Sequence, residues 1–349
     1  MVTFVPLILK RFHYLSMSRC FESVGIGFGD VPIGLFADLA AFADKFDFGS
    51  LWIQENDNDG TIVLSAAALL ATKHLVVGTG ITSPFRRHPQ TLAIETATLN
   101  QLSKNRFTLG LGAAERLSRT LRLPAKPIEA MRDAFAIIRG MYSTNNFTYN
   151  GRVFAVTTPQ SRLSPNPRIY MGALGPRMLD LAGELADGVI LSRRTTFSAK
   201  YTKDAIDRVT QKAKSVGRNP SGIYSVGFFE TCLAKNGDEA RRFAKKILGT
   251  YTIPGTPSDV LKLEGLYSPD IQNVKSNYLK GNLDAAVRNV TDDLVNRFAL
   301  AGTADECLEK LSSHIGTGLK CPILYIHGPD HKEATELAAE RIVPGLITR

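Results

Sequence analysis

Short runs of β-branched and apolar residues alternate with amphipathic segments along most of the chain, and this alternation constrains the fold more than any other feature. The clearest unit covers residues 75–112. It contains a β-branched run at 75–79, a loop, an amphipathic segment at 91–102 and a second run at 107–111. In the amphipathic segment Leu92, Thr96 and Leu99 recur at helical spacing. A strand–helix–strand unit of this length joins two parallel strands.

The same pattern occurs eight times. The eight predicted strands cover residues 23–28, 48–53, 75–79, 107–111, 168–171, 188–191, 223–233 and 322–327, and a helical segment follows each of them. Eight such units predict an α/β fold, a (β/α)8 TIM barrel. A doubly wound sheet would need fewer strands, and no GxGxxG motif opens a helix after the first strand.

Two stretches interrupt the alternation, so we expect a barrel with insertions. Residues 145–156 contain Asn150-Gly151 between two short apolar runs, which predicts a β-hairpin. Residues 252–300 are irregular, with three prolines followed by polar, helix-like segments. We expect a single barrel domain over residues 21–349. Residues 1–20 precede the periodic pattern and are expected to be an N-terminal extension without a secretory signal.

Composition narrows the functional class. Of 349 residues 44% are apolar and 21% charged, which is usual for a soluble globular protein, and no apolar run approaches the roughly 20 residues of a membrane-spanning helix. Cys20, Cys232, Cys307 and Cys321 are far apart, which argues against a disulfide framework and favours a cytoplasmic location. No basic run with interleaved aromatic residues indicates nucleic acid. The net charge of +9 reflects either solubility or a preference for an anionic small-molecule ligand.

Loops at the carboxyl ends of barrel strands carry functional sites, and two of them suit an anion. Gly172 to Pro176 follow the fifth strand and expose backbone N–H groups at a helix N-terminus, which favours a phosphate. An ordinary tight turn is the alternative interpretation. Arg193 and Arg194, with Ser192, follow the sixth strand and suit a phosphate or carboxylate. The alternative is a solvated pair of surface arginines.

Two other loops offer candidate catalytic residues. Glu55 and Asn56 follow the second strand and can donate a proton or hydrogen bonds to a ligand ring, although such residues are common in any loop. Glu115 follows the fourth strand and is a candidate general acid, with a helix-dipole partner as the alternative. The six histidines lack metal-ligand spacing, so no metal site is predicted.

Two segments resemble a known family. VGTGITSPFRRHPQTLAIETATLNQLSKNRFTLGLG resembles the corresponding part of the bacterial luciferase-like flavin and deazaflavin oxidoreductases. Within that superfamily, IYMGALGPRMLDLAGELADGVILS at residues 169–192 is most similar to methylenetetrahydromethanopterin reductase, which uses the 8-hydroxy-5-deazaflavin coenzyme F420. The resemblance extends from about residue 24 to residue 328. It implies a luciferase-like barrel that holds F420 across the carboxyl ends of its strands, and a homodimer.

The resemblance also implies roles for individual residues. A non-prolyl cis peptide bond would lie between Gly80 and Ile81 and support the ring of the cofactor. The phosphate would lie at the turn that follows the fifth strand, and the anionic tail near the two arginines. The implied cofactor-binding residues are Gly80, Ile81, Thr82, Gly112, Gly172, Ala173, Leu174, Gly175, Pro176, Ser192, Arg193 and Arg194. The implied residues on the substrate side are Glu55, Asn56 and Glu115.

The chain departs from this family at two positions. The reductases carry a glutamate in the first strand and an Asp-His pair after the second, whereas this chain has Gly27 and Glu55-Asn56 there. The leading hypothesis is an F420-dependent oxidoreductase that transfers a hydride to or from a carbon substrate, a CH–NH or CH–OH group, as methylenetetrahydromethanopterin reductase does. The alternatives are an FMN-dependent luciferase-like monooxygenase and a cofactor-binding protein without turnover.

Overall fold

The eight predicted strands form a closed parallel barrel. The structure is a computed structural model that describes residues 21–56, 59–114, 126–159 and 162–347. The barrel strands are β1 (Gly25–Phe28), β2 (Ser50–Ile53), β3 (Val76–Thr79), β4 (Phe107–Leu111), β7 (Arg168–Ala173), β8 (Gly188–Leu191), β9 (Tyr224–Leu233) and β11 (Cys321–Ile326). Each pairs in parallel with the next, and the β8–β9 and β11–β1 pairs close the ring. The prediction of a (β/α)8 barrel is confirmed.

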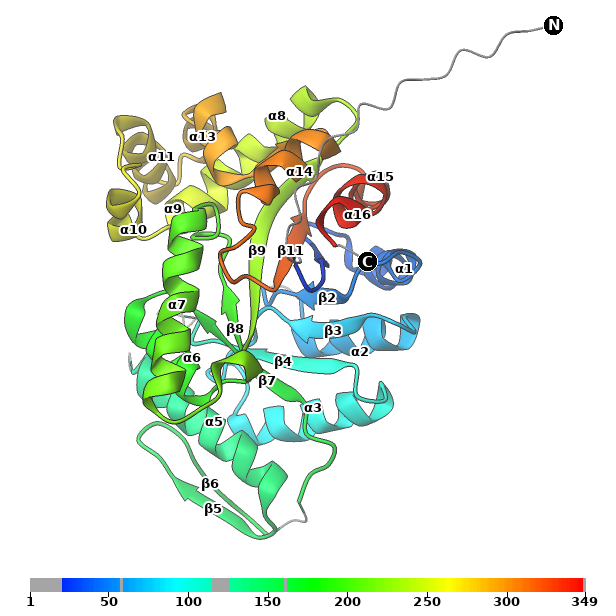
Figure 1. The fold of residues 1–349 in the computed structure, drawn as a ribbon, viewed down its shortest axis with the longest axis vertical. Helices are drawn as coiled ribbons and strands as arrows, with labels where there is room; N and C mark the ends of the chain where they lie inside the picture. Colours follow the sequence, from blue (N-terminus) through cyan, green and yellow to red (C-terminus); the bar gives the residue numbers. More distant parts are fainter. Residues whose placement is uncertain (1–20, 57–58, 115–125, 160–161, 348–349) are drawn as a thin grey trace, which may run out of the picture.

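Helices surround the barrel (Figure 1). Those that follow its strands are α1 (Phe36–Ala43), α2 (Thr61–Ala71), α3 (Pro89–Leu102), α5 (Pro127–Ser143), α6 (Pro176–Leu185), α7 (Ala199–Ser215), α8 (Gly237–Ile247), α14 (Ala304–Ser312), α15 (His331–Leu337) and α16 (Val343–Leu346). Two short 3-10 turns, Ile33–Leu35 and Pro220–Gly222, precede α1 and β9, and a π-helical turn, Ala338–Ile342, joins α15 to α16. No helix in the described part of the chain is long and apolar enough to cross a membrane.

Residues 252–300, where the sequence pattern is irregular, form a series of short helices, in agreement with the helix-like segments of that stretch. A π-helical turn (Leu248–Thr252) leads into α9 (Ile253–Gly255), α10 (Ser258–Leu263), α11 (Pro269–Leu279), α12 (Leu283–Arg288) and α13 (Asp292–Phe298). These helices pack with α8 around their own apolar cluster, which includes Leu248, Ile271 and Leu294. A further strand, β10 (Leu300–Gly302), then pairs with β9. Short helices with only a few apolar positions each give weak periodicity, because their packing partners are distant in sequence.

The predicted hairpin is present as β5 (Phe147–Asn150) and β6 (Ala155–Thr158), paired antiparallel. Its loop has four residues, and the carboxylate of Asp133 in α5 holds it by accepting the backbone N–H groups of Val153 and Phe154 at 2.6 and 3.0 Å. The hairpin and the helical insertion lie at opposite ends of the molecule (Figure 1). Neither interrupts the barrel.

Large rings fill the interior of the barrel. Trp52, Phe228 and Tyr325 belong to one buried cluster that points inward from β2, β9 and β11. The facing strands contribute glycines where there is no room for a side chain. At Gly110 in β4 a Cβ atom would overlap the carbonyl oxygen of Thr79 in β3. Eight-stranded barrels are just wide enough for their side chains to fill, so such positions are fixed by packing.

We expect Gly110→Ala to lower the free energy of unfolding by about 1–3 kcal/mol or more, because the overlap is with backbone that cannot turn away. Chemical denaturation followed by far-UV circular dichroism measures the change. Gly34→Ala is the matched control, since a Cβ at Gly34 meets no atom within 4 Å. Equal stability of the two variants would contradict this account of the barrel interior.

Candidate active site

The loops that follow β3, β4 and β7 lie side by side at the carboxyl ends of the barrel strands. In the sheet, β3 neighbours β4, which neighbours β7, which neighbours β8. Ile81, which follows β3, lies against two glycines. A Cβ at Gly112 would come within 2.5 Å of Ile81 Cδ1, and one at Gly172 within 2.8 Å of Ile81 Cγ2. The three residues therefore form one continuous surface, which we call the Ile81 floor.

The peptide bond between Gly80 and Ile81 is cis, as the resemblance implied. Hydrogen bonds hold this segment from both sides. The Gly80 N–H donates to the carbonyl of Ile53 (2.7 Å), and the carbonyl of Ile81 accepts from the Glu55 N–H (3.3 Å). On the other side, Thr82 donates its N–H to Gly110 (2.9 Å). The floor is thus tied to the ends of β2 and β4.

Glu55 braces the loop that follows β3. Its carboxylate accepts hydrogen bonds from the Thr82 hydroxyl (3.0 Å) and the Ser83 backbone N–H (3.1 Å), and it pairs with Arg87 at 3.2 Å. The side chain is only 6% exposed. Burial raises the pKa of the Glu55 carboxyl, and its hydrogen bonds and the charges of Arg86 and Arg87 oppose that rise. These partners make Glu55 a positioning residue for the β3 loop.

The two other candidate catalytic residues differ in what the structure shows. Asn56 turns toward its own loop, where its Nδ2 donates to Asp59 Oδ2 and its Oδ1 accepts the Asp59 N–H, both at 2.7 Å. The backbone carbonyl of Asn56 also accepts from Arg86. Glu115 lies outside the described residues, so its role as a general acid stays a prediction.

The turn after β7 presents the N-terminus of α6. Gly175 is the N-cap and Pro176 the first helical residue, no side chain caps the helix, and its first turn contains no acidic residue. A Cβ at Gly175 would meet nothing within 4 Å, so the space in front of the helix is open. The Tyr201 hydroxyl donates to the carbonyl of Leu174 and fixes the turn. Pro176 has no N–H and Met178 donates its own to the Gly175 carbonyl (3.1 Å), so the Arg177 N–H and the positive end of the helix are what α6 offers to an anion.

The two adjacent arginines after β8 have different surroundings. Arg194 packs against the helical insertion. A Cβ at Gly255 would overlap its Nε. Its guanidinium lies 4.7 Å from the ring centroid of Tyr251. No ion pair joins it to an acidic residue of the described ranges. Arg193 is buried and lies between the rings of Tyr251 (4.2 Å) and Tyr325 (4.7 Å). The surface-pair interpretation does not hold for Arg193.

Arg193 forms a buried ion pair that the sequence analysis missed. Its Nε lies 2.5 Å from Glu230 Oε1, and the Thr252 hydroxyl donates to the same oxygen. The other oxygen of Glu230 lies 2.9 Å from His327 Nε2. The Nδ1 of His327 faces Asp30 Oδ2 at 3.6 Å, beyond hydrogen-bond distance. The sequence contained a signal for this position. Glu230 lies two residues after the inward-facing Phe228 in the same strand, so its side chain is on the inward face as well.

The ionisation of this cluster follows from its geometry. Burial alone would raise the pKa of Glu230, but the charge of Arg193 and the hydrogen bond with His327 outweigh it and lower that pKa to about 2. Burial acts to lower the pKa of His327, whereas the Asp30 and Glu230 carboxylates raise it above its ordinary value. Glu230 is therefore an anion at neutral pH, and the imidazolium form of His327 is favoured.

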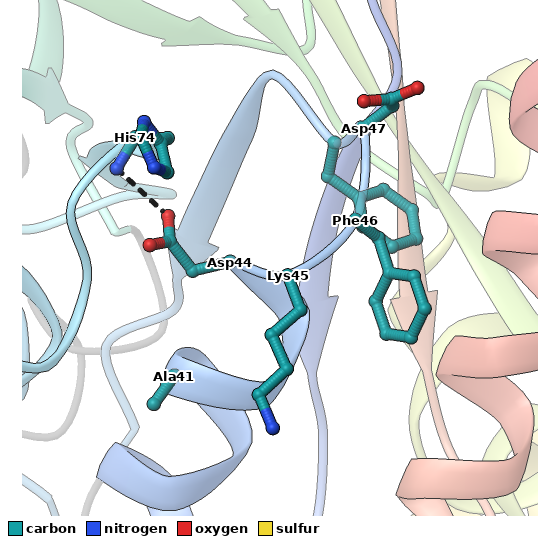
Figure 2. A pocket seen from close by; sticks show the side chains of 7 residues that line it. Ala41, Asp44, Lys45, Phe46, Asp47 and His74 are labelled. Atoms are coloured by element: carbon teal, nitrogen blue, oxygen red, sulfur yellow. Dashed lines mark hydrogen bonds between the residues drawn. The ribbon is translucent and has the colours of Figure 1, made fainter.

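A cavity of about 650 Å³ lies at the opposite end of the barrel. Figure 2 shows Asp44 turned toward His74 beside it. Asp44 accepts the backbone N–H groups of Lys73 (2.6 Å), His74 (3.0 Å) and Leu75 (2.8 Å). These loops precede β2 and β3, away from the carboxyl ends where barrel sites lie. We assign the Asp44 cluster to structure, because it anchors the start of β3.

Comparison with known proteins decides the family. The sequence profile of the luciferase-like monooxygenase family matches residues 13–321, well over half of the chain. The chain belongs to the luciferase-like monooxygenase family. A curated relative is the 5,10-methylenetetrahydromethanopterin reductase of Archaeoglobus fulgidus, which is 29% identical over 317 residues that cover 87% of this chain and 93% of the relative.

Solved structures share the fold. The coenzyme F420-dependent tetrahydromethanopterin reductase from Methanopyrus kandleri superposes with a TM-score of 0.84 at 24% identity, covering 93% of this chain and 99% of that one. An F420-dependent secondary alcohol dehydrogenase, solved with an F420-acetone adduct, gives a TM-score of 0.75 at 20% identity, covering 93% and 100%.

The first strand of this luciferase-like chain has no room, at Gly27, for the glutamate that the resemblance ascribes to the reductases. A Cβ at Gly27 would lie 2.7 Å from the Tyr325 ring and 2.8 Å from the carbonyl oxygen of Trp52. At Gly29 it would overlap the ring of His327. The buried carboxylate beside His327 comes instead from Glu230 in β9.

We expect Glu230→Ala to lower the free energy of unfolding by about 3–5 kcal/mol, because it leaves the buried charge of Arg193 uncompensated. Urea denaturation at pH 7 measures the loss. Asp207→Ala is the control: it removes an exposed ion pair with Lys203, which is worth at most about 0.5 kcal/mol. A loss below 1 kcal/mol for Glu230→Ala would show that the buried pair is not as drawn.

Proposed function

We propose that this chain is an F420-dependent oxidoreductase that transfers a hydride between the deazaflavin and a carbon atom of a small molecule. The observation that carries the proposal is the pairing of the Ile81 floor with the open N-terminus of α6 at adjacent strand ends. A cofactor with a flat ring and an anionic group would place the ring on the Ile81 floor and the anionic group at the N-terminus of α6. Relatives with this fold are named as F420-dependent reductases and dehydrogenases.

The residues present fit such a cofactor. The Ile81 floor is apolar, and glycine at positions 112 and 172 gives the side chain of Ile81 its place. The turn at Gly175 offers backbone donors for a phosphate. Arg194 would bind the anionic tail together with Lys275, whose Nζ reaches only backbone carbonyls, those of Ile253 and Thr256, in the described structure. Arg193 is not assigned to the tail, because Glu230 neutralises it. When bound, F420 supplies the hydride chemistry.

For the substrate, we propose the methylene group of 5,10-methylenetetrahydromethanopterin first, a CH–NH substrate, and an alcohol CH–OH group second. The relative from Archaeoglobus fulgidus supports the first choice. The change from glutamate to Gly27 weakens it, because that carboxylate is part of the pattern of the reductases. The protein itself contributes orientation and electrostatics to either reaction.

Titration with F420 and, separately, with FMN tests the cofactor. We expect saturable quenching of F420 fluorescence and no comparable response with FMN. Tight FMN binding without F420 binding would contradict the proposal and favour the monooxygenase. Stopped assays with the methylene pterin and with secondary alcohols then test turnover by the absorbance of oxidised F420. Binding without turnover on any imine, pterin or alcohol would leave a cofactor-binding protein.

We expect Gly175→Asp to weaken F420 binding at least about tenfold while unfolding stability stays constant or rises. An aspartate at the N-cap bonds to the N–H groups of the first turn, which is worth roughly 0.5–2 kcal/mol and excludes a second anion. The open space at this position accommodates the side chain. Fluorescence titration and thermal unfolding measure the two effects.

Gly175→Ala is the matched control, since it adds a Cβ in the same open space without a charge. It should retain F420 affinity. Unchanged affinity in Gly175→Asp would remove the α6 N-terminus from the cofactor site.

We also propose a homodimer, formed through α2 and α3. Helix α2 (TIVLSAAALLA) carries no charged residue, yet Val63 and Leu70 are 69% and 78% exposed. Ile94 and Leu102 on α3 are exposed as well, and the two helices follow the neighbouring strands β2 and β3. Contiguous exposed apolar patches of this kind mark interaction surfaces.

We expect Val63→Glu combined with Leu70→Glu to give a monomer, because each buried carboxylate would lack a partner in the interface. Multi-angle light scattering should then give the mass of one chain, 38.1 kDa, in place of twice that value. Leu279→Glu is the control at an equally exposed leucine of the helical insertion. A monomeric wild-type protein, or a dimer that survives both glutamates, would refute this interface.

A further inference from the structure

Four ionisable side chains form a line at the carboxyl ends of β1, β8, β9 and β11. We call Asp30, His327, Glu230 and Arg193 the rim line. Successive members lie 3.6, 2.9 and 2.5 Å apart. The side chain of Asp30 is 64% exposed, whereas those of the other three are at most 6% exposed. The line thus leads from solvent into the interior of the barrel.

We propose that the rim line is a proton relay, in which His327 holds the proton that the substrate exchanges during hydride transfer and Asp30 connects His327 to water. This inference rests on the proposed function and assigns its acid–base step. Glu230 and Arg193 act as positioning residues, because they hold the imidazole and balance its charge.

Two buried rings connect the relay to the proposed cofactor site. The ring of Phe228 lies directly against Gly80, where a Cβ would overlap its Cζ. The centroid of Phe228 is 5.9 Å from that of Tyr325, which is 5.1 Å from that of His327. His327 is therefore linked to the cis peptide segment through the packed rings of Phe228 and Tyr325.

Three buried polar atoms of the rim line lack a hydrogen-bond partner in the described residues. They are Nδ1 of His327 and both Nε and Nη1 of Arg193, of which Nε faces Glu230 in the ion pair. Buried polar atoms in native proteins nearly always form a hydrogen bond, so atoms that do not form one indicate a bound ligand or a functional role. Nδ1 can give a proton to a bound group, and Nη1 can donate to one of its oxygens.

The end of β1 is shaped to accommodate the relay. Gly29 leaves room for the imidazole, since a Cβ there would overlap the ring. Asp30 has a φ of +56°, which L-residues seldom adopt. Backbone conformations of this kind cluster at functional sites.

The chemistry balances with one proton. When a hydride from the reduced deazaflavin reaches an imine or carbonyl carbon, the π electron pair moves to the nitrogen or oxygen, which then needs a proton. The imidazolium of His327 supplies that proton and becomes neutral, and Asp30 returns one from water. In the oxidising direction the imidazole accepts the proton. Glu55 cannot replace His327, because its carboxylate is held by Thr82, Ser83 and Arg87.

The groups around His327 decide the direction of the pH effect. The charged or titratable side chains that face it or its partners are Asp30, Lys246, Arg193, Glu230, Tyr325 and His331. The two carboxylates raise the pKa of His327, and burial lowers that of His331. Catalysis by the imidazolium is therefore present at low pH and lost as pH rises through the pKa of His327.

An NMR titration of the cofactor-free protein tests the relay without turnover. We expect the His327 ring signal to titrate above the ordinary value of about 6.5. Removal of the neighbouring charge in Glu230→Gln, or in Asp30→Asn at the exposed end, should lower that pKa, because each carboxylate favours the imidazolium. A wild-type His327 that titrates at or below the ordinary value would overturn the relay.

The pH profile of kcat tests the same relay in the working enzyme. We expect His327→Gln to lower kcat about 10²-fold or more and to abolish the alkaline limb, with little change in the Kd for F420. Asp30→Asn should shift that limb to lower pH. His314→Gln is the control: His314 is buried and its Nε2 bonds to the carbonyl of Thr196 at 2.7 Å, so the limb should stay in place.

The outcomes separate the relay from the proposed function. If His327→Gln turns over with the kcat and the alkaline limb of the wild type, the relay is overturned, and the proposed oxidoreductase function is unaffected. Failure of the wild-type protein to bind F420 overturns the proposed function, and the catalytic role of the relay with it.

Discussion

The limited width of an eight-stranded barrel governs the rest of this structure. Such a barrel holds only enough side chains to fill itself, so each large ring on one strand requires a small residue on another. Tyr325 and His327 on the β11 side take the space over β1, and β1 accordingly presents Gly27 and Gly29. The buried carboxylate beside His327 therefore does not come from β1, and Glu230 of β9 supplies it.

Charge pairing at the rim follows from the same packing. A carboxylate and a guanidinium taken out of water each cost several kcal/mol, and mutual attraction with good hydrogen bonds must offset that cost. Glu230 meets this condition through Arg193, His327 and Thr252. As a result the charge of Arg193 is neutralised by Glu230, whereas the charge of its neighbour Arg194 is not neutralised by an acidic residue of the described ranges. Two adjacent arginines thus differ in their ion pairing.

The proposed site divides between a fixed part and a variable part. The fixed part is the Ile81 floor, which the ends of β2 and β4 and the Glu55 brace hold in place. The variable part is the helical insertion after α8, which packs around its own apolar cluster and contributes Tyr251 and Lys275 beside the rim. In barrels of this class a constant framework with variable loops supports different substrates, and the insertion is the place where this chain would set its own preference.

Sequence alone determined the barrel, because eight apolar runs of strand length separated by helical periodicity leave few other arrangements. It also indicated the α6 turn, since its glycines and proline act through local backbone geometry, whereas the cis peptide at Ile81 was implied by the resemblance to the luciferase-like family. Only the tertiary structure determined the surroundings of the charged residues. Glu55 accepts hydrogen bonds from the β3 loop, and Arg193 is paired with Glu230 whereas Arg194 is not. Folding also brings Asp30, Glu230 and His327 together across nearly 300 residues of chain. The ionisation of a side chain depends on the neighbours that folding provides, and no local pattern of residues encodes those neighbours.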